Sequence, residues 1–295
     1  MQSNTFPSFS SITEQYIDLR TPIVREGTLT RIYRPTFRSW LTVLPDRPIN
    51  TYTKLDVQAF VARRLKTVSR TSVNINLRVL KAFGRWCTEM EVLPERNTFA
   101  TIKQLRVDEQ PIRYLTMGEF KAILEAEPLA KYRALYTVAL LTGLRLGTVL
   151  SLRWSWIDLG QKVLTVRNED DFRTKNGQCQ TIPLSDTVVE VLRRQPQNSA
   201  GLVFVNEHHV FPTKLSRDYV THRFKRTAVA AGFPDVKFHT LRKSFGSLLL
   251  RSDVNILKVS RLLGHSSLAV TMKHYANLLP AELAEDVNRL RLTTT

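Results

Sequence analysis

The sequence has little of what builds disulfide-rich, membrane-spanning or cysteine-ligated metal proteins. Its 295 residues include only two cysteines, Cys87 and Cys179, which lie far apart in the chain. A disulfide framework or a cysteine-based metal site is therefore not expected, and two reduced thiols suit a cytosolic protein. No apolar run approaches the roughly 18 residues of a membrane-spanning helix, and residues 1–4 lack the charged and then apolar order of a signal peptide. We expect a cytoplasmic protein without a membrane partner.

Acidic residues are scarce as well. There are 26 Asp and Glu against 43 Lys and Arg, so the formal charge is +17 and the isoelectric point lies near 10.2. Such an excess indicates a polyanionic partner, with nucleic acid as the first candidate, although a merely basic surface would share it. Residues 1–107 hold 17 Lys and Arg and 8 Asp and Glu, a net of +9, which leaves +8 for the remainder. Two basic halves suit a clamp on double-stranded DNA, with affinity that comes from counterion release.

The first hundred residues have the apolar periodicity of helices. Helices are predicted over residues 36–44, 55–65 and 72–90, whereas roughly the first 30 residues contain no clear helix start. That opening segment is short for a further DNA-binding domain. We expect the basic residues on and between the helices to contact a DNA backbone, although an ordinary solvated helix face is the alternative. They are Arg63, Arg64, Lys66, Arg70, Arg78, Lys81 and Arg85.

Periodicity fades between residues 93 and 116, which we interpret as a linker. Beyond it, Val163–Val166 has the pattern of a strand, and residues 172–184 are predicted to form a hairpin that turns at Asn176-Gly177. The remaining segments are predicted as helices: residues 117–127 and 132–143, and those that follow residues 186, 216, 239, 255, 268 and 280. The expected fold is mainly α with a small antiparallel β-sheet (α+β), as a helical domain over 1–107 and a larger domain over 108–295.

Two arginines and a histidine stand where they could bind a phosphate. Arg145 follows Gly143, at which an apolar helix is predicted to end, and a planar guanidinium can bind two phosphate oxygens. His239 and Arg242 are three residues apart at the start of a predicted helix, so they share one face. Taken singly, these residues could also be an arginine at a helix end and a satisfied surface pair.

A lysine, a second histidine and a tyrosine complete the set. Lys175, at the expected hairpin tip, could reach a groove and act as a general acid, although lysines at such tips are usually only solvated. His265 lies in a Gly-His-Ser-Ser turn between two predicted helices, and Tyr275 lies on the second of them. A phenol with a reference pKa of about 10 becomes a nucleophile when nearby cations favour the phenolate; the alternative is a packing residue. Together, the six side chains can grip a phosphodiester and attack it without a metal ion.

These segments resemble the signature boxes of the tyrosine recombinase (phage integrase) family. The boxes are Thr142–Arg145, His239–Arg242, and Leu263–Ser267 with Tyr275. The resemblance runs from about residue 113 to 279. It implies a catalytic domain within residues 108–295, preceded by a helical DNA core-binding domain over residues 1–107.

The resemblance also implies a mechanism. Tyr275 would attack a DNA phosphodiester, form a 3′-phosphotyrosyl bond and release a 5′-hydroxyl, while Arg145 and Arg242 hold the non-bridging oxygens. Lys175 would protonate the leaving oxygen. The histidines of the second and third boxes would hydrogen-bond the phosphate, with His239 the better placed to help deprotonate the tyrosine. No cofactor, ATP or metal is implied.

Three positions depart from the family pattern. Thr148 stands where many members carry an acidic residue, and Lys243 stands where a histidine is frequent. Tyr275 follows His265 by ten residues, where nine is common. One extra residue turns a helical side chain by about 100°, so the way in which Tyr275 enters the site is left open.

Three other functions compete with this interpretation. Residues 258–275 could form a helix-turn-helix of a non-catalytic regulator, which would leave the other boxes unused. A type IB topoisomerase would share the chemistry but act without a specific site. A metal-dependent nuclease is disfavoured, because its possible acidic ligands gather around the hairpin as loop charges: Asp158, Glu169, Asp170 and Asp171.

The expected assembly is a homotetramer on two DNA sites. Leu283, Val287 and Leu290 share one side of a predicted helix over residues 280–292, which would dock on a neighbouring protomer. Accessory DNA-bending proteins and a nucleoid-associated location are further expectations.

Overall fold

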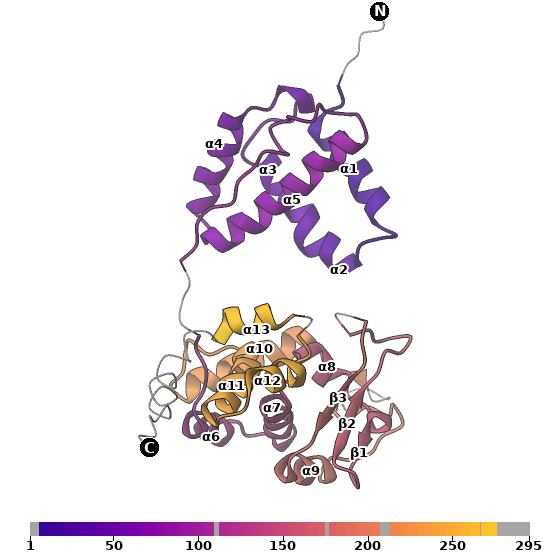
Figure 1. Cartoon of the computed structure of the whole chain (residues 1–295), viewed down its shortest axis with the longest axis vertical. Helices are drawn as coiled ribbons and strands as arrows, with labels where there is room; N and C mark the ends of the chain where they lie inside the picture. Colours follow the sequence, from indigo (N-terminus) through magenta and orange to yellow (C-terminus); the bar gives the residue numbers. More distant parts are fainter. Residues whose placement is uncertain (1–5, 109–111, 175–176, 207–212, 266, 276–295) are drawn as a thin grey trace, which may run out of the picture. The chain divides into compact units, whose positions relative to one another are not determined.

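The chain forms two compact units, Met1–Glu109 and Gln110–Thr295. The computed structural model describes residues 6–108, 112–174, 177–206, 213–265 and 267–275 (Figure 1). Most of these residues are helical, and the strands form small antiparallel sheets, so the predicted fold class is confirmed. None of the described helices is both long and apolar enough to cross a bilayer.

The secondary-structure elements of unit 1 are all helices in the part of the chain that the structure describes. Its elements are α1 (Phe9–Arg20), α2 (Glu26–Thr28), the π-helical turn η1 (Leu29–Tyr33), α3 (Arg34–Leu41), the 3₁₀ turn η2 (Ile49–Thr51), α4 (Lys54–Leu65) and α5 (Arg70–Glu89). The three predicted helices correspond to α3, α4 and α5. Thr53 precedes α4 and donates its backbone N–H to Asp56, which fixes the helix start.

The helix α1 was missed by the sequence prediction. Ser8 caps it, since the Ser8 hydroxyl accepts a hydrogen bond from the Ser11 N–H at 3.3 Å. Phe9, Ile12 and Tyr16 then lie on the buried side. A serine followed by this apolar spacing is an N-terminal helix signal that the prediction overlooked.

Aromatic side chains fill the core of unit 1. Phe9 lies at its centre, with ring centroids 5.6 Å from those of Trp40, Tyr52 and Phe83. These residues come from α1, α3, the segment before α4, and α5. Such ring pairs add to the stabilisation from buried apolar area, so they hold α5 and its basic residues on a rigid body.

In unit 2, the other elements pack around one helix, α7, which is nearly fully buried. The helices of unit 2 are α6 (Met117–Ala126), α7 (Ala130–Thr142), α8 (Leu146–Leu150), η3 (Trp154–Trp156), α9 (Asp186–Arg193), α10 (Arg217–Ala230), α11 (Phe238–Arg251), α12 (Ile256–Leu262) and α13 (Leu268–Tyr275). Its strands are β1 (Ile157–Asp158), β2 (Val163–Val166), β3 (Gln180–Pro183), β4 (Val205–Asn206) and β5 (Thr213–Lys214). In Figure 1 the three-stranded sheet lies on one side of α7 and α11 lies on the other.

The predicted hairpin over residues 172–184 is wrong in its pairing. The strand β3 pairs with β2, with Val166 opposite Gln180, so residues 167–179 form one long connection. Within it, Phe172 pairs instead with Glu169 in an isolated bridge. Glu169 and Asp171 both bind Arg153, which explains why the connection folds on itself before β3 begins.

Candidate active site

Arg145 stands at a sharp change of direction between two helices. The helix α7 ends at Gly143, whose φ of +63° favours glycine and whose Cα lies against the Phe245 ring. Arg145 then caps α8, and its carbonyl accepts from the Thr148 N–H at 2.8 Å. Burial lowers the pKa of the half-buried Arg145 guanidinium, which nevertheless stays protonated. Among the described residues, no group accepts a hydrogen bond from it, so its donors can meet an anion.

Arg242 connects two loops that are distant in sequence. It lies on α11 with 6% of its surface exposed. Its Nη1 donates to the Gly143 carbonyl at 2.7 Å, and its Nη2 donates to the Leu263 carbonyl at 2.5 Å. A buried cation needs such partners. The Arg145 loop and the His265 turn therefore meet because one guanidinium bonds both.

His239 lies one helical turn before Arg242. It is in the first turn of α11, and its side chain is exposed. The prediction that both residues lie near the start of one helix is therefore confirmed. His239 is not among the described residues that line the cavity discussed below.

His265 is held by the turn between α12 and α13. Its backbone N–H donates to the Ser260 carbonyl at 3.1 Å. Its Nδ1 lies 2.7 Å from the hydroxyl of Thr271, a fully buried residue on α13. This contact fixes the imidazole relative to α13. The sequence prediction missed Thr271, although a threonine among apolar residues on a short helix is a signal for a buried polar partner.

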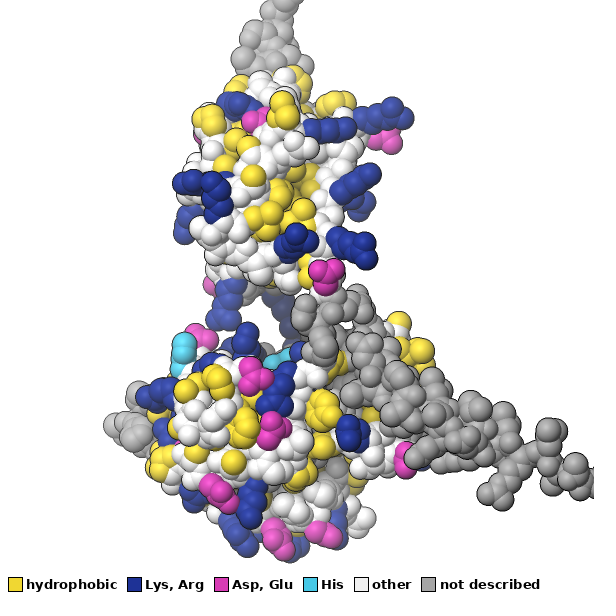
Figure 2. Space-filling model, turned by 90° about the vertical axis from the view of Figure 1, so that its left-hand side faces the viewer, with side chains coloured by type: hydrophobic (Ala, Val, Ile, Leu, Met, Phe, Trp, Pro, Cys, Tyr) yellow, Lys and Arg dark blue, Asp and Glu magenta, His cyan; other side chains and the backbone are white. Residues whose placement is uncertain are grey.

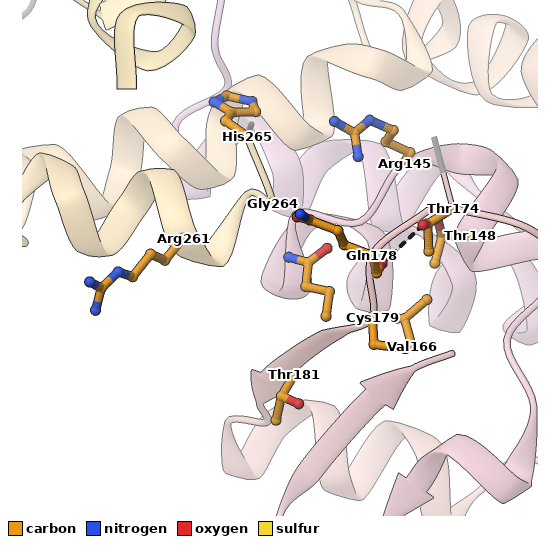
Figure 3. A pocket seen from close by; sticks show the side chains of 11 residues that line it. Arg145, Thr148, Val166, Thr174, Gln178, Cys179, Thr181, Arg261, Gly264 and His265 are labelled. Atoms are coloured by element: carbon orange, nitrogen blue, oxygen red, sulfur yellow. Dashed lines mark hydrogen bonds between the residues drawn. The ribbon is translucent and has the colours of Figure 1, made fainter. Parts of the chain in front are cut away.

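Arg145 and His265 open onto one cavity of about 300 Å³ (Figure 3). Figure 3 shows both side chains on the same side of it, Arg145 from the start of α8 and His265 from the turn after α12. The β2–β3 connection and β3 supply the opposite wall, with Thr174, Gln178 and Gln180 among its residues. No carboxylate of the described residues lines this cavity, so its charge is positive and suits a phosphate.

Lys175 lies outside the described residues, and the structure defines only its neighbours. Thr174 lines the cavity. The Asn168 side chain accepts from the Thr174 N–H at 2.8 Å and donates to the Gly177 carbonyl at 2.5 Å. One amide therefore bonds both Thr174 and Gly177, the described residues on either side of positions 175 and 176.

Tyr275 is the last residue of α13, and its side chain lies outside the described part of the chain. Its backbone position is one helical turn beyond Thr271, the partner of His265. The predicted helix over residues 280–292 also lies outside the described residues.

The acidic residues near the β2–β3 connection have structural partners. Glu169 and Asp171 form ion pairs with Arg153, with N···O distances of 2.9 and 2.5 Å. Asp158 accepts the backbone N–H groups of Gly160 and Gln161 in a turn. Within the described ranges, no three His, Cys, Asp or Glu residues gather as metal ligands.

Thr148 and Lys243, two of the three departures from the family pattern, both lie close to the site. Thr148 lines the cavity together with Arg145, and its side chain carries no charge. Lys243 is half-buried on α11, next to Arg242. The cavity is therefore more cationic than an acidic residue at position 148 would make it.

The predicted DNA-contact residues of unit 1 carry uncompensated charge. None of the seven forms a salt bridge within the described part of the chain. Arg78, Lys81 and Arg85 share one face of α5, whereas Arg63 and Arg64 lie in the last turn of α4. Figure 2 shows Lys and Arg side chains on both borders of the α4 side of unit 1, around a hydrophobic centre. Such a face can bind a phosphate backbone.

Comparison with known proteins identifies relatives along nearly the whole chain. The family model described as the phage integrase family matches residues 113–282. Tyrosine recombinase XerA of Pyrococcus furiosus is 31% identical, over 81% of this chain and 82% of the relative. A tyrosine recombinase of Thermosipho africanus is 26% identical over 95% of this chain and 99% of its own. The match to the XerC-like tyrosine recombinase of Caldanaerobacter subterraneus, 28% identical, spans 62% of this chain and about half (54%) of that relative.

Solved structures share the fold. The Tn1549 transposon integrase in complex with transposon right end DNA has a TM-score of 0.79 and 18% identity, over 96% of this chain and 99% of the other. The lambda integrase tetramer bound to a Holliday junction has a TM-score of 0.76 and 21% identity, over 90% and 80% of the two chains. At these identities the likeness concerns the fold alone.

Proposed function

Because the chain belongs to the phage integrase family, as its sequence boxes predicted, we propose that it is a site-specific DNA recombinase. It would cleave and rejoin DNA strands through a 3′-phosphotyrosyl intermediate. The observation that carries the proposal is the double contact of Arg242, which brings the Arg145 loop and the His265 turn to one cationic cavity.

In this proposal the cavity binds the scissile phosphate. Arg145 donates to the non-bridging oxygens, and Arg242 contributes its charge from the buried side. If Nδ1 of His265 accepts from the Thr271 hydroxyl, Nε2 carries the proton and donates to a phosphate oxygen. These donors stabilise the charge that develops as the phosphorus becomes five-coordinate.

Tyr275 is proposed as the nucleophile. Its oxygen bonds to phosphorus as the bond to the 5′-oxygen breaks, and Lys175 gives that oxygen a proton. His239 assists in removing the phenolic proton. A 5′-hydroxyl from a second strand then attacks the phosphotyrosine and regenerates Tyr275, so the phosphodiester energy is conserved without ATP or a metal cofactor.

Unit 1 is proposed as the core-binding domain. Its basic face on α4 and α5 would bind the DNA backbone and release counterions. Residues 110–295 would then form the catalytic domain.

The proposed assembly is a homotetramer on two duplexes. The lambda integrase neighbour is a tetramer on a Holliday junction, which supports this assembly for a chain of the same fold. The segment 280–292 would dock on the adjacent protomer, and deleting residues 280–295 would weaken synapsis. Accessory DNA-bending proteins and a nucleoid location belong to the same proposal.

The proposal is tested by covalent trapping on DNA that carries its recombination site with a nick beside the cleavage point. The wild-type protein should form a denaturant-resistant adduct, because the short cleaved fragment diffuses away. Tyr275→Phe should bind this DNA within about 2-fold of wild type and form no adduct, since only the phenolic oxygen is lost.

Adduct formation by Tyr275→Phe would contradict the assignment. If the protein were a helix-turn-helix regulator, neither the wild type nor Tyr275→Phe would form an adduct with the DNA. A type IB topoisomerase would also relax plasmids that lack the site, which the proposed recombinase should not do.

A further inference from the structure

The turn between α12 and α13 is held at two consecutive carbonyl groups by side chains from two other elements. Arg242 of α11 donates to the Leu263 carbonyl at 2.5 Å. Gln180 of β3 donates its Nε2 to the Leu262 carbonyl at 2.7 Å. The first contact belongs to the family boxes, whereas Gln180 lies outside every box identified in the sequence.

Gln180 also touches the glycine of this turn. Gly264 has a φ of +59°, and a Cβ there would lie 2.6 Å from Oε1 and 2.9 Å from Cδ of Gln180. The amide therefore packs against the Gly264 backbone and bonds the carbonyl two residues earlier. The next residue, His265, lines the cavity and contacts α13 through Thr271.

The backbone of Gln180 is fixed independently of the turn. It is the first residue of β3, opposite Val166 of β2. Loss of the bond from Gln180 to the Leu262 carbonyl would therefore let the turn between α12 and α13 move relative to the sheet. Gln180 itself donates to a carbonyl and has no charge to offer a phosphate.

We propose that Gln180 is a positioning residue, which sets the place of His265 and of the start of α13 relative to the sheet through its bond to the Leu262 carbonyl. The inference rests on the proposed function for its catalytic consequence. The structural part of the inference, that Gln180 restrains the turn, does not depend on the proposed function.

The role depends on a donor at one position along the side chain. Gln180→Met places a methyl group where Nε2 stood and removes the donor at nearly constant length. Gln180→Arg retains a hydrogen-bond donor at this position, because Nε of arginine is as many bonds from Cα as Nε2 of glutamine. Gln180→Glu places a carboxylate oxygen against the Leu262 carbonyl, which is repulsive. Gln161→Met is the matched control, since Gln161 is an exposed residue between β1 and β2.

The full-length variants are compared in single-turnover cleavage of the nicked DNA at saturating protein. We expect Gln180→Met to cleave about 10- to 100-fold more slowly than wild type, because misplacement of catalytic groups by about 1 Å costs on the order of 100-fold. Gln180→Glu should be slower still, Gln180→Arg within about 3-fold of wild type, and Gln161→Met unchanged. DNA affinity of Gln180→Met should stay within about 2-fold. Equal rates for Gln180→Met and wild type, or Gln180→Met faster than Gln180→Arg, would overturn the catalytic part.

Hydrogen exchange gives a readout that does not depend on activity. Peptides that cover residues 256–275 should exchange faster in Gln180→Met than in wild type, while peptides from α6, α7 and unit 1 stay unchanged. Unchanged exchange in 256–275 would refute the positioning role, and faster exchange throughout unit 2 would show a general loss of stability instead. Failure of wild type to form an adduct would count against the proposed function alone, because exchange still tests the restraint by Gln180.

Discussion

Arg242 shows how one side chain can organise a site before it contacts any substrate. Its two Nη groups reach carbonyls 120 residues apart, and no other residue type presents two such donors in a planar fork. The sequence predicted Arg242 as a phosphate ligand from its box. That it also joins the ends of α7 and α12 depends on tertiary packing, which no local pattern encodes.

A lysine at position 242 should therefore fail although it retains the charge. One ammonium on a flexible stem cannot bond both carbonyls in the same geometry. Arg242→Lys should lose about 1–3 kcal/mol of unfolding free energy, the usual cost of leaving a buried polar group unpaired, and at least about 100-fold in cleavage rate. Urea denaturation and single-turnover cleavage measure the two losses.

Arg251→Lys is the matched control on the same helix, because Arg251 is exposed and its guanidinium bonds the Tyr114 hydroxyl rather than the loops of the site. It should change neither quantity appreciably. If Arg242→Lys cleaved DNA as fast as Arg251→Lys, the bridging role would be wrong.

Among the elements, α6 and α10 are joined by a buried ion pair that lies outside the site. Glu127, which follows α6, is fully buried and binds Arg223 and Thr227 of α10. Burial acts to raise the pKa of the Glu127 carboxyl, but the hydrogen bonds from Arg223, Leu129 and Thr227 outweigh it and keep the pKa below its usual value. The carboxylate is thus stabilised by folding, and its contribution is present above the unfolded pKa of about 4.3.

Glu127→Gln should lower the unfolding free energy by about 3 kcal/mol at pH 7, because Arg223 keeps a buried charge without a counterion. The difference from wild type should shrink as the pH falls below about 4, where the wild-type carboxylate itself becomes protonated in the unfolded and then in the folded state. Denaturation at pH 7, 5 and 3.5 measures this trend. Glu125→Gln, an exposed change on α6, serves as the control. A cost that stayed constant down to pH 3.5 would contradict the charge-based explanation.

Prediction from sequence succeeded where an element carries its own signal. The helix predicted over residues 117–127 is present as α6, and Thr116 and Glu119 form a capping box at its start with both reciprocal hydrogen bonds. It failed in the β2–β3 connection, where Asn176-Gly177 suggested a tight hairpin. There, Arg153 and Asn168 fold residues 167–179 through contacts that the local pattern does not contain. The sequence prediction missed two further residues for the same reason: Gln180, which lines the cavity and bonds a carbonyl distant in the sequence, and Thr271, the buried partner of His265.

At the scale of the whole molecule, the charge of +17 should govern DNA affinity. If six to ten cationic groups contact phosphates, affinity should fall by about 10³–10⁵ between 50 and 200 mM salt. Replacing Arg78, Lys81 and Arg85 with Gln should reduce the slope of log K against log salt by about 1 for each phosphate that these side chains neutralise.

The control for these changes is the pair Lys121→Gln and Arg194→Gln, two exposed cations that already face a glutamate on their own helices. Fluorescence anisotropy over a salt series measures both sets. An equal effect per charge in the two sets would mean that the α5 face has no special part in DNA binding.

The central claim, that Arg145 meets the charge of the scissile phosphate, is tested most directly by neutralising that charge. Single-turnover cleavage by wild type and Arg145→Ala is compared on DNA with an ordinary phosphodiester and with a methylphosphonate at the cleavage point. Arg145→Ala should be slower than wild type by about 10²–10³-fold on the phosphodiester, and by far less on the uncharged linkage, which no longer needs the guanidinium. An equal loss on both substrates would show that Arg145 acts elsewhere.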